Sequence, residues 1–176
     1  MICNKLERCH VEISSGHRIC LKPHKCIDFC DNRSTPACSE RKKVYSINNP
    51  ERKYMFLSYH VDGGVISVDA TTPVNTKKCD YLFLIHDFTN PSAILVELKG
   101  RNTNDAIEQI NGTLSLFSDF FNSCHRVYGR IVNTCGVPNM QNTPSYITVN
   151  KRLKVLNGNL RTSERIYQDQ YEKLDN

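Results

Sequence analysis

The sequence lacks several features that mark large classes of protein. No stretch of its 176 residues approaches the roughly 18 apolar residues that a membrane-spanning helix needs, so we expect no membrane partner. The opening residues, MICNKLERCH, contain no apolar run of the secretory-signal type, which favours a cytoplasmic location. No glycine-rich phosphate loop occurs, and no serine or cysteine nucleophile has a recognisable partner motif. These absences argue against a membrane protein, a P-loop enzyme and a serine or cysteine hydrolase.

The regular cysteine spacing of a zinc site is also missing, because no CxxC pair occurs although the chain has nine cysteines. Six of them lie in the basic segment 1–43, beside three histidines: Cys3, Cys9, Cys20, Cys26, Cys30, Cys38, His10, His17 and His24. The odd total, without a secretory signal, argues against a disulfide framework. We expect reduced thiols that pack as small apolar groups, and a zinc-stabilised interaction protein is the alternative left open.

The excess of basic over acidic side chains is small. Lys and Arg total 23 against 18 for Asp and Glu, a net charge of +5, which suits a polyanionic partner without requiring one. Lys77, Lys78 and Arg101 are candidates for contacts to nucleic-acid phosphates, and so is the run Arg41–Lys43.

The strand signals lie in the middle of the chain. We expect a single domain over residues 1–176 with its α/β core at 54–150. Strand-forming residues on both sides of Asp62-Gly63-Gly64 predict one β-hairpin. The apolar runs 81–85 and 93–98, separated by turn-forming residues, predict a second.

After Gly100 the hydrophobic period changes from two to about 3.6. This period predicts a helix from about Asn104 to Ser123. The remaining predicted elements are strands at 126–134 and 144–149 and a terminal helix at 161–173. Their order predicts an α/β fold with a mixed central β-sheet flanked by α-helices.

The second hairpin brings three charged side chains together. If its turn spans residues 86–91, Asp80 lies opposite Glu97, and opposed residues of an antiparallel pair share a face. Lys99 lies on that face too, because side chains alternate along a strand. Two facing carboxylates in a largely apolar sheet repel each other and need a cation between them. A divalent metal bound by Asp80, Glu97 and the backbone carbonyl of Leu98 would meet that need.

This pattern resembles a known family. Asp80, an apolar strand, a turn, a second apolar strand, Glu97-Leu98-Lys99-Gly100 and an amphipathic helix are similar to the core of the PD-(D/E)xK nuclease superfamily, in particular its small bacterial members. The resemblance covers residues 54–125 in arrangement and about ten positions in motif. The sequence departs from the family pattern at Cys79, where proline commonly precedes the aspartate.

The resemblance implies a restriction-endonuclease-like core and a metal-dependent nuclease. Asp80 and Glu97 would bind Mg²⁺ or Mn²⁺, and Lys99 would be the catalytic lysine. Gln109 matches a helical glutamine near the site in some branches, and Glu40 and Glu51 are candidates for an additional upstream acid.

The implied substrate is nucleic acid, with DNA favoured over RNA, and a homodimer is compatible with the resemblance. A catalytically inactive nuclease fold, used for binding or as an effector in a defence system, is the rival interpretation. Fold alone does not decide between them.

Overall fold

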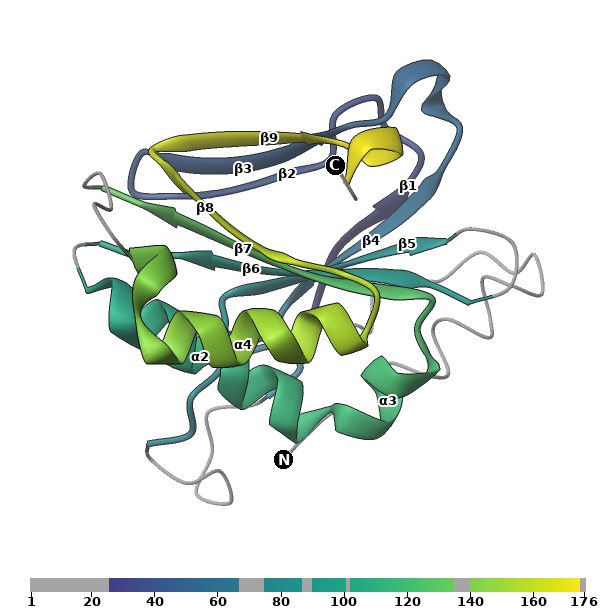
Figure 1. The fold of residues 1–176 in the computed structure, drawn as a ribbon. Helices are drawn as coiled ribbons and strands as arrows, with labels where there is room; N and C mark the ends of the chain where they lie inside the picture. Colours follow the sequence, from purple (N-terminus) through teal and green to yellow (C-terminus); the bar gives the residue numbers. More distant parts are fainter. Residues whose placement is uncertain (1–25, 67–74, 87–89, 101, 135–139, 175–176) are drawn as a thin grey trace.

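The chain folds into three layers (Figure 1). The computed structural model describes residues 26–66, 75–86, 90–100, 102–134 and 140–174. A six-stranded sheet forms the middle layer. Helices cover one of its faces, and a three-stranded sheet covers the other. The protein is thus a mixed α/β structure.

The middle sheet has the strand order β1-β4-β5-β6-β7-β8. Its strands are β1 (Ile27–Asp31), β4 (Met55–His60), β5 (Tyr81–His86), β6 (Ser92–Leu98), β7 (Arg126–Asn133) and β8 (Leu160–Glu164). Neighbours from β1 to β6 pair antiparallel, whereas β6–β7 and β7–β8 pair parallel, so the sheet is mixed. The predicted hairpin β5–β6 occupies the centre, and its strands are almost wholly buried, as apolar runs of this kind require.

The smaller sheet has the order β2-β3-β9 and consists of β2 (Ala37–Glu40), β3 (Lys43–Asn48) and β9 (Ile166–Gln170). Strand β3 pairs antiparallel with β2 and parallel with β9. Apolar side chains of both sheets meet in an inter-sheet core. Its members include Phe29, Tyr45, Ile47, Phe56, Phe83, Ile94, Val96, Leu98, Tyr128 and Val132.

The helical layer contains α2 (Thr103–Leu116), α3 (Ser118–Ser123) and α4 (Pro144–Val155), with short 3-10 turns η1 (Pro50–Arg52), η2 (Met140–Asn142) and η3 (Tyr171–Lys173) elsewhere. Asn102 caps α2 by accepting a hydrogen bond from the Asp105 amide. The predicted helix 104–123 is interrupted at Phe117, whose φ of −120° and ψ of 32° are not helical. No helix among the described residues is long and apolar enough to cross a membrane.

The predicted strand at 144–149 is wrong, because these residues begin α4. Thr143 caps the helix by accepting a hydrogen bond from the Tyr146 amide, and Pro144 lies in the first turn, where its missing N–H is harmless. Tyr146, Val149 and Leu153 then face the core at helical spacing. Capping and this apolar stripe override the strand preference of the β-branched residues.

The predicted terminal helix at 161–173 is also wrong. These residues form β8, β9 and η3, with a turn at Arg165, whose φ is 58°. Strand β8 pairs with the edge of β7, and β9 pairs with β3. Partners distant in sequence supply the backbone hydrogen bonds, so a polar segment without an apolar helical stripe becomes two edge strands.

The predicted hairpin around Asp62-Gly63-Gly64 is not found among the described residues, which end at Ile66 here and resume at residue 75. Both edges of β4 are already occupied, by β1 and β5, which leaves no place for a returning strand. The turn itself is present, with Gly63 at a φ of 76°. Val65 and Ile66 pack into the core after it, and their amides bond back to the His60 and Val61 carbonyls without continuing as a strand beside β4.

Candidate active site at the end of the central hairpin

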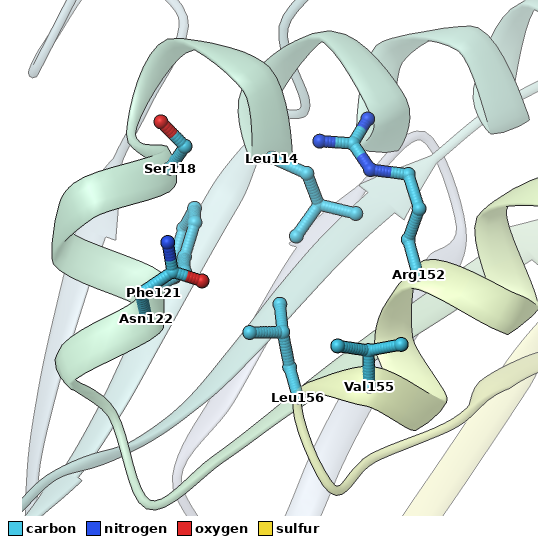
Figure 2. A pocket seen from close by; sticks show the side chains of 7 residues that line it. All are labelled: Leu114, Ser118, Phe121, Asn122, Arg152, Val155 and Leu156. Atoms are coloured by element: carbon cyan, nitrogen blue, oxygen red, sulfur yellow. The ribbon is translucent and has the colours of Figure 1, made fainter.

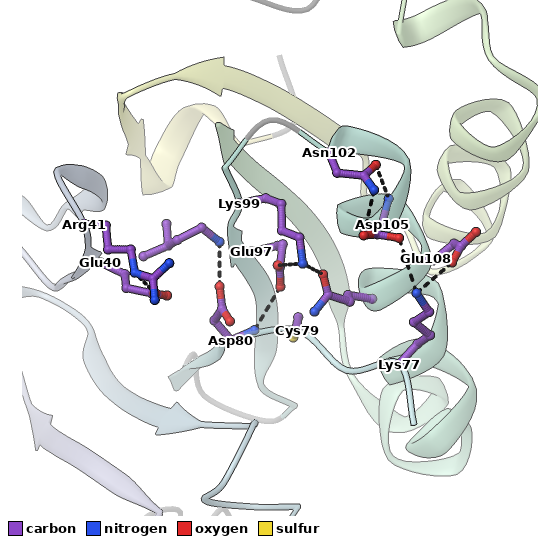
Figure 3. A network of polar contacts seen from close by, with 12 residues as sticks. Glu40, Arg41, Lys77, Cys79, Asp80, Glu97, Lys99, Asn102, Asp105 and Glu108 are labelled. Carbon is purple, nitrogen blue, oxygen red and sulfur yellow. Dashed lines mark hydrogen bonds and ion pairs between the residues drawn. The ribbon is translucent and has the colours of Figure 1, made fainter. Parts of the chain in front are cut away.

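The register of the central hairpin places Asp80 beside Glu97. Tyr81 pairs with Val96 and Ile85 with Ser92, and extending this register by one residue sets Asp80 opposite Glu97. The Asp80 amide donates a hydrogen bond to Glu97 Oε2 at 3.2 Å, and the Leu98 amide donates one to Asp80 Oδ2 at 2.8 Å (Figure 3). The predicted pairing of the two residues is confirmed.

Helix α2 fixes the segment that carries Asp80. A Cβ atom at Gly112 would lie 2.2 Å from the Lys77 carbonyl oxygen, so only glycine allows the chain to pass this close to the helix. The Cys79 amide then donates a hydrogen bond to Thr113 Oγ1 at 2.8 Å, and the Thr113 hydroxyl donates to the Gln109 carbonyl. The segment that leads into β5 is therefore held to α2 by two contacts, the close approach of Lys77 to Gly112 and the hydrogen bond from Cys79 to Thr113.

Lys99 continues β6 beyond its last strand residue, with its amide bonded to the Val132 carbonyl at 2.9 Å. Its ammonium donates a hydrogen bond to Gln109 Oε1 at 2.9 Å and lies 3.9 Å from Glu97 Oε1 (Figure 3). Gln109 comes from α2 and holds the lysine over the carboxylates. The structure thus brings the predicted accessory residue Gln109 into contact with the predicted catalytic lysine.

Burial shapes the protonation of the two carboxyl groups. The Glu97 side chain is only 1% exposed, and burial raises its pKa to about 9; the neighbouring Asp80 charge acts in the same direction, while Lys99 opposes the shift. Burial also raises the pKa of Asp80, although the hydrogen bond from the Leu98 amide opposes this. The ionised form of both carboxyl groups is therefore disfavoured in the folded chain.

A polar cavity of about 440 Å³ opens at this end of the sheet. Its lining residues are Glu40, Arg41, Lys43, Asp62, Asp80, Glu97, Leu98, Lys99, Gly100, Gln109 and Thr134. A second cavity of about 190 Å³, between α3 and α4, is lined by apolar groups, two polar ones and Arg152, with no carboxylate (Figure 2). Of these two cavities, only the first is lined by carboxylates, the ligands that hard divalent cations favour.

The two candidate upstream acids lie in different places. Glu40, at the end of β2, lines the polar cavity, and its charge contributes to raising the pKa of both Asp80 and Glu97. Glu51 is exposed in η1 and precedes β4, whose first residue Met55 pairs with His86 at the opposite end of β5. The length of β5 separates that end from Asp80 by roughly 20 Å. Glu51 is therefore not part of the cluster.

Two of the predicted phosphate-contacting lysines, Lys77 and Lys78, are engaged by acidic side chains. Lys77 Nζ lies 3.4 Å from Asp105 Oδ1 and 3.1 Å from Glu108 Oε2. Lys78 Nζ lies 3.1 Å from Oδ1 of Asp62, which lines the cavity. Arg101, the third candidate, lies outside the described residues.

The described residues offer two neighbouring carboxylates, Asp80 and Glu97, but no zinc site. Among the described residues, no group of three or more His, Cys, Asp or Glu side chains could hold a metal. A structural zinc site needs such a group, whereas Mg²⁺ is commonly held by one or two carboxylates together with substrate phosphates and water. The Leu98 amide points toward Asp80, and the carbonyl of a strand residue points to the same side as its amide, so the Leu98 oxygen also faces this edge.

The described cysteines behave as the sequence predicts. Cys38, Cys79 and Cys124 are free thiols. Burial raises the pKa of Cys124 to about 12, and the pKa values of Cys38 and Cys79 are raised further, so these thiols stay protonated. Cys3, Cys9, Cys20 and the N-terminal histidines lie outside the described residues.

Comparison with protein-family models, with curated proteins and with solved structures found no match for this chain. The chemistry of the polar cavity is therefore the basis for assigning a function.

Proposed function

We propose that this protein is a metal-dependent nuclease of the PD-(D/E)xK type, with a restriction-endonuclease-like core, that hydrolyses phosphodiester bonds of nucleic acid. DNA is the favoured substrate. One observation carries the proposal: the carboxylates of Asp80 and Glu97 meet at the end of two central strands, in a cavity that also receives the Lys99 ammonium.

The carboxylate pair supports a cation-binding role. Burial raises the pKa of both carboxyl groups, and the Asp80 charge raises that of Glu97 further, so the ionised pair destabilises the folded chain. Natural folds keep such arrangements mainly where they bind or catalyse. A bound Mg²⁺ or Mn²⁺ would polarise a phosphate oxygen and lower the pKa of a water molecule at the site. Asp80, Glu97 and the Leu98 carbonyl would hold it.

Lys99 has the contacts of a catalytic group rather than of a surface lysine. Its side chain is 28% exposed and opens on the cavity, and Gln109 accepts one of its hydrogen bonds. Lys99 can therefore orient an attacking water molecule and stabilise the negative charge that develops on the phosphate. Gln109 is a positioning residue that restricts where the ammonium lies.

The arrangement of elements supports the same assignment. A central antiparallel hairpin carries the acidic residues, and the helix that follows it packs against the hairpin and supplies Gln109. The parallel strands β6 and β7 end at the same edge. Ligand sites of α/β sheets commonly lie at the carboxyl ends of such strands.

The decisive experiment is incubation of the purified full chain with linear and circular DNA, single-stranded DNA and RNA, in Mg²⁺, Mn²⁺ or EDTA. We expect cleavage of at least one substrate with metal and none with EDTA. Asp80→Asn, Glu97→Gln and Lys99→Met should each abolish it. Lys151→Met, which removes an exposed lysine of α4, is the matched control and should cut at the wild-type rate.

The proposal has two clear points of failure. If Glu97→Gln and Lys99→Met both cut as fast as the wild type, the site is wrongly assigned. If the wild type cuts nothing with either metal but binds nucleic acid, a catalytically inactive binding module becomes the better interpretation.

A further inference from the structure

Lys43 is a buried lysine that the proposed chemistry leaves without a role. It begins β3 and is only 3% exposed, on the strand face that it shares with the fully buried Tyr45 and Ile47. That face packs against the middle sheet. Because Lys43 is the first residue of the strand, it lies at the end of the inter-sheet layer, where it lines the polar cavity.

The Lys43 ammonium lacks the counter-groups that the other cations of the cavity have. Arg41 Nε lies 3.4 Å from Glu40 Oε1, and Lys99 donates to Gln109. No hydrogen bond or ion pair joins the Lys43 side chain to another residue within the part of the chain that the structure describes. A charged group taken so far out of water needs a compensating partner. The cavity is the place from which an anion could supply it.

The turn between β2 and β3 places Lys43 at the edge of the polar cavity. Glu40 pairs with Lys43, so Arg41 and Lys42 are the two residues of the β2–β3 turn, with φ values of 46° and 66°. Positive φ at both positions is the geometry that best fits the twist of a two-residue hairpin, but it normally calls for Asn-Gly. Basic residues in this conformation are unusual, and strained backbone of this kind clusters at ligand sites.

The cavity receives positive charge from two opposite layers. Lys99 enters on the helix-covered side of the middle sheet, and Lys43 enters on the side of the smaller sheet. We infer that Lys43 binds a phosphate oxygen of the nucleic-acid backbone. In this arrangement the β2–β3 hairpin contacts the nucleic-acid strand and keeps it beside Asp80 and Glu97. This inference rests on the proposed function, because it takes the anion to be the nuclease substrate.

The test measures binding rather than cleavage. In an Asp80→Asn, Glu97→Gln background, which removes the carboxylate charges, the affinity for a fluorescent DNA duplex and for the same strand alone is measured over a range of salt concentrations. Adding Lys43→Met should weaken binding on the order of tenfold and reduce the slope of log affinity against log salt by about one. Lys42→Met, on the same turn but exposed and outside the cavity, should change neither.

Two further measurements separate a binding role from a structural one. Lys43→Arg should restore the salt slope, because it keeps the charge. Lys43→Met should melt no lower than its parent, since it removes a buried ammonium without a protein partner. An unchanged affinity and slope in Lys43→Met would overturn the inference, and so would a parent protein that binds neither form of DNA. Binding that depends on Lys43 in a protein that never cleaves would refute only the proposed function.

Discussion

Two clusters of buried charge lie on opposite faces of the middle sheet, and they differ in how completely their charges are matched. On the inter-sheet side, Arg130 of β7 meets Asp169 of β9. On the helix-covered side, Asp80 and Glu97 face each other with Lys99 nearby. The first cluster is closed to solvent, and the second opens on the polar cavity.

The Arg130 cluster is balanced. Arg130 is fully buried and Asp169 nearly so, and Tyr45 adds a hydrogen bond to Asp169 Oδ2 at 2.9 Å. Burial disfavours the charged guanidinium, yet attraction to Asp169 outweighs it and raises the pKa of Arg130. Asn159 accepts further hydrogen bonds from Nη1, and the rings of Tyr128 and Tyr167 flank the guanidinium. This cluster links the two sheets and its opposite charges are paired, although Arg130 Nη2 has no hydrogen-bond partner among the described residues.

The Asp80 cluster is rich in carboxylates whose charges are not balanced pair by pair. Glu40, Asp62, Asp80 and Glu97 all line the cavity, and burial raises the pKa of the central pair. Nearby, the Asn133 side chain at the end of β7 is buried, and neither its Nδ2 nor its Oδ1 atom has a hydrogen-bond partner in the described structure. Buried polar groups are normally paired, so these two atoms are available to bond water or a ligand. Charge matching thus distinguishes the cluster that links the two sheets from the one for which we propose a chemical role.

The largest effect on stability should come from removing one charge of the buried Arg130–Asp169 pair. Asp169→Asn leaves the Arg130 charge buried without its partner, which we expect to lower the free energy of unfolding by about 3–5 kcal/mol. Urea denaturation followed by circular dichroism measures this. The double variant Arg130→Met, Asp169→Leu should recover most of the loss, because it removes both charges together. A loss below about 1 kcal/mol for Asp169→Asn would mean that this ion pair matters no more than a surface pair.

At the Asp80–Glu97 cluster, removing a charge should raise the stability rather than lower it. The pKa of Glu97 is raised from 4.5 to about 9 on folding, so between these values the folded chain binds more protons than the unfolded one. Without metal, stability should therefore fall as the pH rises through this window, with a slope of at most about 1.4 kcal/mol per pH unit. Glu97→Gln should remove this slope and gain on the order of 2 kcal/mol at the alkaline end.

Bound Mg²⁺ should reverse the expected dependence of wild-type stability on pH. Mg²⁺ binds ionised carboxylates, so it should stabilise the wild type more as the pH rises and leave Glu97→Gln unaffected. Thermal melts with Mg²⁺ or EDTA across the pH window measure both trends. A wild-type stability that rises with pH in EDTA would contradict the assigned protonation of Glu97.

The open cluster was predictable from the sequence because its parts are local. Strand alternation and a short turn fix the register of β5 and β6, and the helical period after Gly100 places Gln109 on the following helix. The signal for α4 was also present, since Thr143-Pro144 is a cap followed by a proline in the first turn. There the β-branched residues led to the wrong element.

The Arg130 cluster and the burial of Lys43 beside the cavity were not predictable in this way, although the run Arg41–Lys43 was a candidate for phosphate contacts. Both depend on the pairing of β3 with β9, which joins residues more than a hundred positions apart in the sequence. Strand β9 is polar and lacks an apolar period, so nothing local indicates its partner. The position of Lys43 beside the cavity follows only from the packing of the smaller sheet on the larger one.

The smallest expected effect lies within the open cluster and measures its repulsion directly. Asp80→Asn should raise metal-free stability at alkaline pH by less than about 1 kcal/mol, because Asp80 is partly exposed and already accepts a hydrogen bond from the Leu98 amide. The double variant Asp80→Asn, Glu97→Gln should gain less than the sum of the two single gains. Each single substitution already relieves the same repulsion between the two carboxylates, so the double variant cannot relieve it twice. Denaturant titrations of the four proteins at one alkaline pH in EDTA give the coupling free energy. Strictly additive gains would show that the two carboxylates do not interact, and the case for a shared cation would lose its physical basis.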